Sequence, residues 1–170
     1  RVSKLNMGYW QDRVAGHTGL KVGLNWSGNS KNPIEAHRRL PIEQLSTLAE
    51  QANITWFSLQ KGATPAPPLP EFFPIIETGP GSIEDTAGLI GALDLVITSD
   101  TAIAHLAGAI GKSVWVILHH DPDWRWAQGD KSPWYPSAQL FRQTTPGNWS
   151  TVFDAVNAEL QVLTSDKPNN

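Results

Sequence analysis

The residues most able to do chemistry follow a strongly apolar run at positions 95–99. Asp100 and Thr101 come directly after this run, and the spacing of the apolar residues beyond them predicts a helix over 101–109. A strand that runs straight into a helix leaves unpaired backbone N–H groups, here near Thr101 and Ala102, and such groups bind anionic phosphate. The pattern therefore predicts a phosphate site at the edge where open α/β sheets bind their ligands.

His105 is the second candidate, one turn into the same predicted helix. The helical repeat gives one face to apolar residues that must pack on the sheet, namely Ile103, Leu106, Ala107 and Ile110. We therefore expect His105, with its small neighbours Ala104 and Gly108, to face away from the sheet with room for a ligand. A solvated surface histidine is the alternative. Asp100 is either only the N-cap of the helix or both a cap and a ligand contact.

A polar turn and an arginine follow the first apolar run, at positions 21–26. Ser27, Gly28 and Asn29 have turn-forming residue types, and the side chains of Ser27 and Asn29 can donate hydrogen bonds from that loop. Arg38 lies in the next segment, and a guanidinium group makes paired hydrogen bonds to phosphate oxygens. Alternatively, Arg38 is one of two solvated charges ahead of a helix.

Two further strand ends carry polar or aromatic residues. Gln60 and Lys61 follow the second long apolar run, and Asp123 and Trp124 lie in a loop-rich stretch after the last one. Loops at this edge of a sheet are where functional residues concentrate. We interpret Asp123 and Trp124 as lining a ligand cleft or, equally, as packing against another domain.

These residues need a sheet to bring them together. Short apolar runs alternate with stretches of helical periodicity, which is typical of strand-helix-strand units around a parallel sheet. Strands are predicted at 21–26, 54–59, 75–76, 95–99 and 113–118. Helices are predicted from Pro41, from Ser82 to Ala92, over 101–109 and over 149–163, with an extended loop at 64–70. The predicted fold class is α/β, a Rossmann-like three-layer domain with a mainly parallel sheet covered by helices on both faces.

Length sets the number of domains. A chain of 170 residues that is 40% hydrophobic can build one packed core and is too short for two full-sized domains. We expect a linker or interdomain helix at 1–19, one domain at 20–165 and a disordered tail at 166–170. Because the chain begins with Arg1, we expect a piece of a longer protein.

Composition and failed motifs exclude several classes of function. A net charge of -3 argues against a nucleic-acid partner, and no apolar run approaches the roughly 20 residues of a membrane span. The absence of cysteine excludes thiolate metal sites and is compatible with the cytoplasm. No metal-ligand spacing is present, so we expect neither a metal nor a cofactor. Residues 79–84 lack the third glycine of a dinucleotide motif, and 111–113 enter a strand, unlike a P-loop.

A family resemblance rests on these same residues. The stretch 99–109, followed by Gly111 and Lys112, resembles the donor-site signature of heptosyltransferase-type glycosyltransferases of the GT-B class. Segments 22–29, 38–41, 58–62 and 122–126 resemble glycosyltransferase-like domains found after tetratricopeptide repeats. Together they cover the chain beyond residue 20. One departure is Ala102, which stands where the family pattern often has glycine.

The resemblance implies half of a GT-B fold, in which two Rossmann-like domains face a cleft and the C-terminal one holds a nucleoside-diphosphate sugar. It assigns catalytic roles to Arg38, which would reach the phosphates, and to His105. It places Gln60 and Lys61 at the base or ribose. Cations and a helix N-terminus can stabilise a leaving diphosphate without a metal. The N-terminal domain, the catalytic base and the acceptor, whether glycan, lipid or protein, then lie outside this chain.

Three functional hypotheses follow. The first is the donor-binding domain of a glycosyltransferase with an unidentified acceptor, inactive by itself. The second is a nucleotide-sugar epimerase, which needs acid and base groups at the sugar, and only Asp100, His105 and Asp123 are available. The third is a non-catalytic module for nucleotide-sugar binding or scaffolding.

Overall fold

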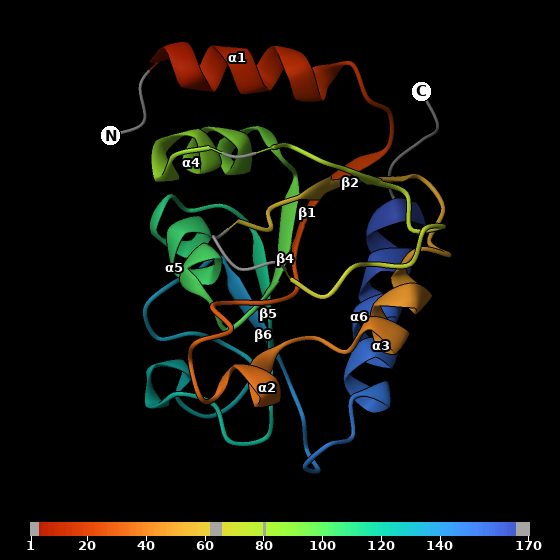
Figure 1. Ribbon diagram of the computed structural model, residues 1–170, viewed down its shortest axis with the longest axis vertical. Helices are drawn as coiled ribbons and strands as arrows, with labels where there is room; N and C mark the ends of the chain where they lie inside the picture. The colour runs from red at the N-terminus through yellow and green to blue at the C-terminus, as the bar shows by residue number, and fades with distance from the viewer. Residues whose placement is uncertain (1–3, 62–65, 80, 166–170) are drawn as a thin grey trace.

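The computed structural model describes residues 4–61, 66–79 and 81–165, which form a layered α/β fold (Figure 1). The elements in chain order are α1 (Lys4–Ala15), β1 (Leu20–Asn25), α2 (Glu35–Arg38), α3 (Ile42–Leu48), β2 (Ile54–Ser58), β3 (Ile75–Ile76), α4 (Ile83–Ala92), β4 (Leu95–Ser99), α5 (Ala102–Ala109), β5 (Val114–Leu118), the 3-10 helix η1 (Trp124–Trp126), β6 (Ala138–Arg142) and α6 (Ser150–Ser165). None of the described helices is both long and apolar enough to cross a membrane.

The strands of the described residues form a single six-stranded sheet in the order β3-β2-β1-β4-β5-β6, and every neighbouring pair is parallel. The predicted α/β class and parallel core are confirmed. From β1 the chain builds outward to β3, and it then returns to the other side of β1 to build β4, β5 and β6. The direction therefore reverses between β1 and β4, and open sheets of this kind bind ligands at the carboxyl ends of those two strands.

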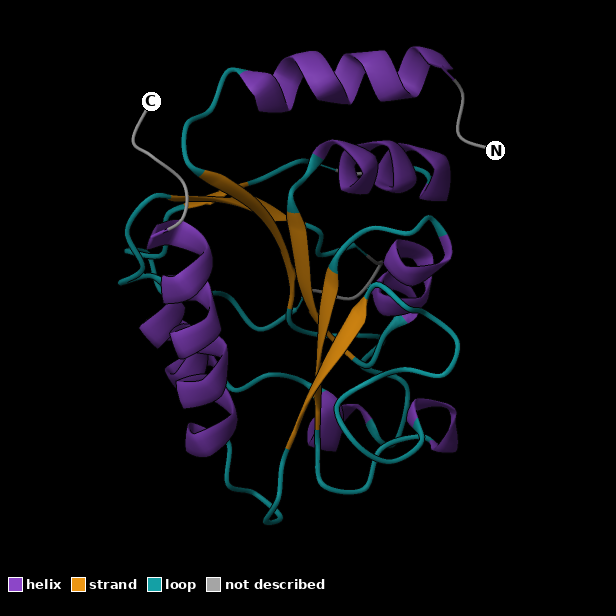
Figure 2. Cartoon of the chain, turned by 180° about the vertical axis from the view of Figure 1, so that it is seen from behind, coloured by secondary structure: helices purple, strands orange, loops and turns teal. Residues whose placement is uncertain are grey.

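Helices cover both faces of the sheet (Figures 1 and 2). On one face, α3 and α6 bury residues such as Leu45 and Phe153 against the strands. On the other face, α4 and α5 bury Leu89 and Ala107. Two hydrophobic cores thus hold the central strands rigidly, and apolar burial of this kind supplies most of the stability of such a domain.

Helix α1 lies over α4 and adds Trp10 and Val14 to the second core (Figure 1). Over residues 6–15 of this helix, Trp10 and Val14 are the buried ones, and Gly88 of α4 permits the contact. A Cβ atom on Gly88 would lie 3.0 Å from Cδ1 of Trp10 and 3.2 Å from the carbonyl oxygen of Asn6. The segment 1–19, expected as a linker or an interdomain helix, therefore contains a helix that packs on this domain.

The ends of α4 and α5 follow from their sequences. Ser82, where a helix was predicted to start, caps α4 in a reciprocal capping box with Asp85. Gly111, at φ +75, ends α5: the N–H of Lys112 donates to the carbonyl of Ala107 and that of Gly111 to the carbonyl of Gly108.

The prediction that Asp100 caps α5 is wrong. Thr101 is the N-cap, and its Oγ1 accepts the N–H of Ile103 at 3.3 Å. The helix therefore begins at Ala102, one residue later than predicted. Asp100 instead lies in the turn between β4 and α5, where it is buried.

The predicted faces of α5 are also partly wrong. Ala104 and Ala107 are the residues fully buried against the sheet, whereas Ile110 is exposed. Two small side chains let the helix backbone approach the strands closely. Gly108, expected to face away from the core, is buried because the ring of Tyr135 packs on it, 2.4 Å from where a Cβ would lie.

Three short elements were not predicted: α2, η1 and β6. Pro41, expected in the first turn of α3, is its N-cap residue. The predicted loop at 64–70 has no helix or strand over 66–70, and its first two residues lie outside the described part of the chain, as does the predicted tail at 166–170. Other element boundaries agree within the residue or two by which assignments ordinarily differ.

Candidate functional site

A pocket of about 690 Å³ opens where β1 and β4 end, a size typical of small-molecule sites. It is lined by every candidate residue named from the sequence except Gln60 and Trp124. The loop after β1, helix α2, the start of α5 and the segment at η1 all contribute. Residues that sequence reasoning did not select also line it, namely Asn25, Lys31, Asn32, Ile34, Ile103 and Arg125.

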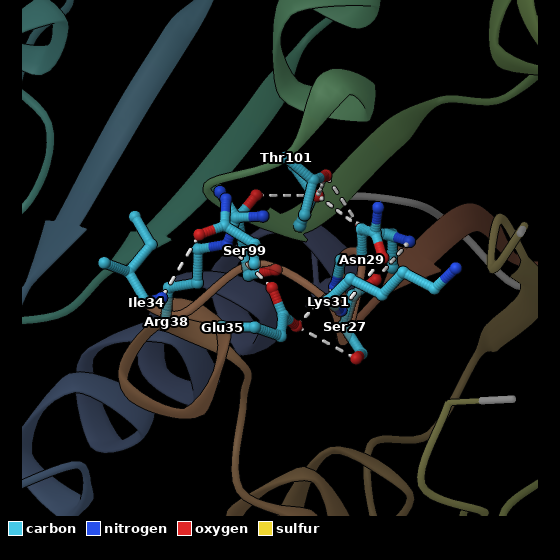
Figure 3. Close-up of polar contacts among 12 residues, drawn as sticks. Ser27, Asn29, Lys31, Ile34, Glu35, Arg38, Ser99 and Thr101 are labelled. Carbon is cyan, nitrogen blue, oxygen red and sulfur yellow. Dashed lines mark hydrogen bonds and ion pairs between the residues drawn. The ribbon is translucent and has the colours of Figure 1, made fainter. Parts of the chain in front are cut away.

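Glu35 organises the β1 side of this pocket (Figure 3). Its carboxylate is buried, with the residue only 5% exposed. Oε1 accepts hydrogen bonds from Oγ of Ser27 at 3.0 Å and from the N–H of Gly28 at 2.5 Å. A buried charge with several donors is stable where an unpaired one would not be. The loop after β1 is therefore held in one conformation by a residue that lies outside it.

Arg38 completes this arrangement. Its Nε donates to Oε2 of Glu35 at 2.7 Å, three residues away along α2. Nη1 and Nη2 of Arg38 make no hydrogen bond to the described residues, and Arg38 lines the pocket. The ion pair thus fixes the guanidinium while leaving its outer edge available to an anionic ligand, the geometry in which arginine binds phosphate.

A second network joins the ends of β1 and β4. Oδ1 of Asn25 accepts from Oγ1 of Thr98 at 3.1 Å and from Oγ1 of Thr101 at 2.9 Å, and all three residues are buried. Buried polar side chains that satisfy one another make a local structure rigid and unique. This network holds the N-cap of α5 against the first strand and so fixes the helix start relative to the loop after β1.

Gln60 supports the pocket from behind. Its Nε2 donates to the carbonyl of Ser27 at 2.7 Å, and its Oε1 accepts the N–H of Ser27 at 3.2 Å and Nδ2 of Asn25 at 3.0 Å. The structure therefore places Gln60 as a clamp on the loop after β1. Its side chain lines a different depression, beside the proline-rich segment.

The start of α5 forms the β4 side of the pocket. The N–H of Ala102 has no acceptor among the described residues, and Ala102 is exposed at the pocket wall. The first turn of a helix carries a partial positive charge as well as free N–H groups. An anionic group entering the pocket would therefore meet the helix start on one side and Arg38 on the other.

His105 is half-buried one turn further along α5. Its ring stacks on that of Trp126, with centroids 5.0 Å apart and planes 16° apart, and its Nδ1 lies 3.1 Å from the hydroxyl of Tyr135. Burial lowers the pKa of His105, and Arg125 lowers it further, while Asp100 and Asp123 oppose the shift. The imidazole is thus held neutral at pH 7, with Nε2 free of any partner among the described residues.

Lys61 stands at the opposite rim. Its Nζ donates to Oγ1 of Thr78 at 3.2 Å and to the carbonyl of Gly79. Burial lowers the pKa of Lys61, while Glu77 and Asp85 oppose that shift. Neutral oxygens therefore position the ammonium group of Lys61, which lines both this pocket and the depression lined by Gln60.

The segment at η1 brings opposite charges to the pocket. Asp123 pairs with Arg125, with Oδ2 2.9 Å from Nη2, and its Oδ1 accepts the N–H of Arg125. Both line the pocket, whereas Trp124 is 75% exposed and lies outside it. Arg125 thus adds a cation, with half of its side chain in solvent.

The whole arrangement suits a ligand with anionic and polar parts. Cations approach from four segments of the chain, contributed by Lys31, Arg38, Lys61 and Arg125. Asp100, 6% exposed, adds a carboxylate beside His105. The residues described here contain no group of three or more His, Asp or Glu side chains that could hold a metal ion.

The fold resembles known glycosyltransferases. It superposes on ADP-heptose LPS heptosyltransferase II of E. coli with a TM-score of 0.60 and 17% identity, over 97% of this chain and 53% of that one. A glycosyl transferase of family 9 from Veillonella parvula gives a TM-score of 0.61 and 13% identity, over 98% and 53% of the two chains. The chain therefore has the fold of about half of a heptosyltransferase-type glycosyltransferase, as the resemblance implied.

Another heptosyltransferase and one curated protein are also similar to this chain. The E. coli heptosyltransferase WaaC, solved with ADP-2-deoxy-2-fluoro heptose, matches with a TM-score of 0.57 and 15% identity, over 92% of this chain and 47% of that one. Protein FlbA of Caulobacter vibrioides is 26% identical over 154 residues, which is 84% of this chain but 25% of FlbA. No family model matches. The chain thus spans about half of its structural neighbours and a quarter of this curated relative.

Sequence reasoning missed the residue that organises the site, Glu35. A signal was present, because Glu35 and Arg38 are spaced three apart, the separation at which an acid and a base pair on a helix. The helix itself was not recognised, since four residues are too few to show a periodic pattern.

Proposed function

We propose that this chain is the donor-binding half of a glycosyltransferase and that its pocket holds a nucleoside-diphosphate sugar. The observation that carries the proposal is that Arg38 and the start of α5 line one pocket. This pocket lies where the strand order of the sheet reverses, between β1 and β4. Two positive groups that face each other from separate elements suit a diphosphate, which carries two adjacent anionic phosphates.

The other pocket residues fit the remaining parts of such a ligand. Lys61, at the rim nearest β2, is suited to the ribose or base, and His105 and Asp100 are suited to a phosphate oxygen or the hydroxyls of the sugar. The positive charges of Arg38, Lys61 and the helix start would stabilise the leaving diphosphate in place of a metal. The structural neighbour solved with ADP-2-deoxy-2-fluoro heptose supports this class of ligand.

We infer that transfer needs a further domain of the same protein. This chain has the fold of about half of the two-domain neighbours, and the acceptor side and the catalytic base would come from the other half. Residues 20–165 would form the donor domain, with α1 leading toward the preceding part. We further propose that tetratricopeptide repeats belong to that part, that the protein is cytoplasmic, and that the acceptor is a glycan, lipid or protein.

Calorimetry tests the proposal directly. ADP, GDP and UDP, their sugar conjugates and the matching monophosphates are titrated into this chain with a chelator present. We expect one of the diphosphates and its sugar conjugates to bind, the matching monophosphate to bind more weakly, and the chelator to have no effect. Equal affinity for mono- and diphosphates would contradict the placement of a diphosphate between Arg38 and α5.

Turnover separates transfer from the other two hypotheses. The complete protein is incubated with the sugar conjugate that binds and with a broad set of acceptors, and products are followed by mass spectrometry. Transfer or hydrolysis of the sugar supports the proposal. Interconversion of the donor sugar would establish an epimerase, and tight binding with no turnover would establish a binding module.

A further inference from the structure

A second pocket, of about 570 Å³ and separate from the depression lined by Gln60, lies on the other side of α2 from the first. The residues that matter for its chemistry are His37, His119, His120, Asp121, Gln143 and Trp149. They come from α2, from the carboxyl end of β5 and from the segment that joins β6 to α6. This pocket is thus also at the ligand-binding edge of the sheet.

Helix α2 separates the two pockets. Arg38 faces the first pocket, Ala36 and His37 face the second, and Ile34 lines both. A ligand in the second pocket would therefore lie beside whatever occupies the first, with one turn of helix between them.

The second pocket contains a buried hydrogen-bond donor with no partner. Gln143 is 3% exposed, and its Oε1 accepts the N–H of His120 at 3.1 Å. Its Nε2 has no hydrogen-bond partner among the described residues. A buried amide N–H without an acceptor is costly, so a ligand that brings an oxygen to this donor gains a favourable contact.

The rest of the lining suits an uncharged polar ligand. Burial lowers the pKa of His119, and His37 and Arg38 lower it further, while Asp100 and Asp121 oppose the shift. The imidazole of His119 is therefore neutral at pH 7, and the carboxylate of Asp121 disfavours an anion. Nδ1 of His119 accepts the N–H of Asp121 at 3.3 Å, so its Nε2 carries the proton and can donate to a sugar hydroxyl. The half-buried indole of Trp149 offers an apolar face.

We propose that this second pocket binds a carbohydrate, whose hydroxyls would bond to Gln143 and the imidazoles while a ring face contacts Trp149. A carbohydrate in this pocket would lie one turn of α2 away from a ligand in the first pocket. Its binding does not depend on the proposed function.

The five histidines of the chain supply the test. His37, His119 and His120 line the second pocket, His105 lines the first, and His17 packs against Phe57 away from both. Their imidazole signals are recorded by NMR while the methyl glycosides of glucose, galactose, mannose and N-acetylglucosamine are titrated up to about 50 mM, well above the millimolar range of weak binding. At least one glycoside should shift the signals of the second pocket and leave that of His17 in place.

A nucleoside diphosphate titrated into the same sample keeps the two proposals apart. It should shift His105 whether or not any glycoside binds, so loss of one response leaves the other to be judged by itself. If none of the four glycosides moves His37, His119 or His120, or if His17 moves equally, the carbohydrate proposal is wrong.

Gln143→Glu is the matched variant, because it keeps the oxygen that accepts the N–H of His120 and removes the unpaired donor. It should weaken glycoside binding about tenfold or more, the effect expected for one hydrogen bond at a buried group. His37→Ala, at an exposed position, checks the pocket without risk to folding, and His17→Ala is its control. Unchanged glycoside affinity in both pocket variants would overturn the proposal.

Discussion

Glu35 and Arg38 face each other along one turn of α2, with Oε2 of the carboxylate 2.7 Å from Nε of the guanidinium. The same carboxylate holds Ser27 and Gly28 through its other oxygen. One buried charge therefore positions both the loop after β1 and the cation that faces the pocket. Substitution of either residue should therefore lower both the affinity for a ligand and the free energy of unfolding.

Arg38→Ala should weaken the binding of a nucleoside diphosphate by roughly 1 to 3 kcal/mol, the range for a hydrogen bond to a charged group. It should also lower the free energy of unfolding, because Glu35 would remain buried with a full charge and fewer donors. Calorimetry measures the first effect and urea unfolding the second. Arg39→Ala, an exposed neighbour of the same type, is the control and should change neither. Unchanged affinity in Arg38→Ala would remove this residue from the site.

Gly28→Ala should disrupt the pocket without touching the core. A Cβ atom there would lie 2.7 Å from Oε2 of Glu35 and 2.8 Å from Nη2 of Arg38, so the ion pair must move. We expect the variant to stay folded but to lose roughly 1 to 3 kcal/mol of stability, as in overpacked sites, and most of its nucleotide affinity. Gly91→Ala in α4, with nothing within 4 Å of its added methyl group, should instead be neutral or slightly stabilising. Nucleotide affinity like that of the parent in Gly28→Ala would argue against the pocket as the site.

Tyr135→Phe should affect His105 alone. The ring would still pack on Gly108, but the hydroxyl that lies 3.1 Å from Nδ1 of His105 would be gone. We expect the thermal midpoint to change little and the affinity for a nucleoside diphosphate to fall by about three- to tenfold, since one neutral hydrogen bond no longer orients the imidazole. The control is Tyr9→Phe, which removes an exposed hydroxyl on α1. If the nucleotide-induced NMR shift of His105 and the affinity both match the parent, Tyr135 does not position His105.

Stability should decrease in mildly acidic solution. Burial lowers the pKa of His105 and of His119 below the ordinary value of 6.5. As the pH falls through 6.5 the unfolded chain takes up protons that the folded chain does not, so the free energy of unfolding declines until the folded histidines also titrate. Urea unfolding between about pH 7.5 and pH 5.5 measures this slope. Replacing both residues by asparagine should flatten it and His17→Asn should not; the same slope in all three proteins would contradict the assignment.

The interior strands β4 and β5 were predictable because they are buried on both faces. Runs such as Leu95–Ser99 and Val114–Leu118 are buried throughout, and a continuous apolar run is a strong local signal. The last strand, Ala138–Arg142, was missed because Gln139 and Arg142 interrupt its apolar pattern. A strand at the edge of the sheet has fewer neighbours to satisfy and tolerates such residues.

Pocket residues were predictable from the sequence mainly where they follow a predicted strand. Residues that come within two positions after a strand, such as Ser27 and Thr101, reach the pocket because parallel strands end at one edge. Gln60 also follows a strand, yet its side chain turns back onto the backbone of Ser27, a contact decided by tertiary packing. The N-cap is Thr101 rather than Asp100, and the hydroxyl of Thr101 donates to Asn25, which is far away in the sequence. Local sequence does not reveal such a contact.

The hydrogen bond from Thr101 to Asn25 joins residues 76 positions apart. Closing so long a loop costs chain entropy before any contact can offset it, so the junction of β1 and β4 is expected to form late in folding, after the local helices. Nascent chain that ends before β4 has no place for the ligand, however much of the loop after β1 it contains. During synthesis, the growing chain would therefore not bind the proposed nucleotide ligand until the second half of the sheet has formed.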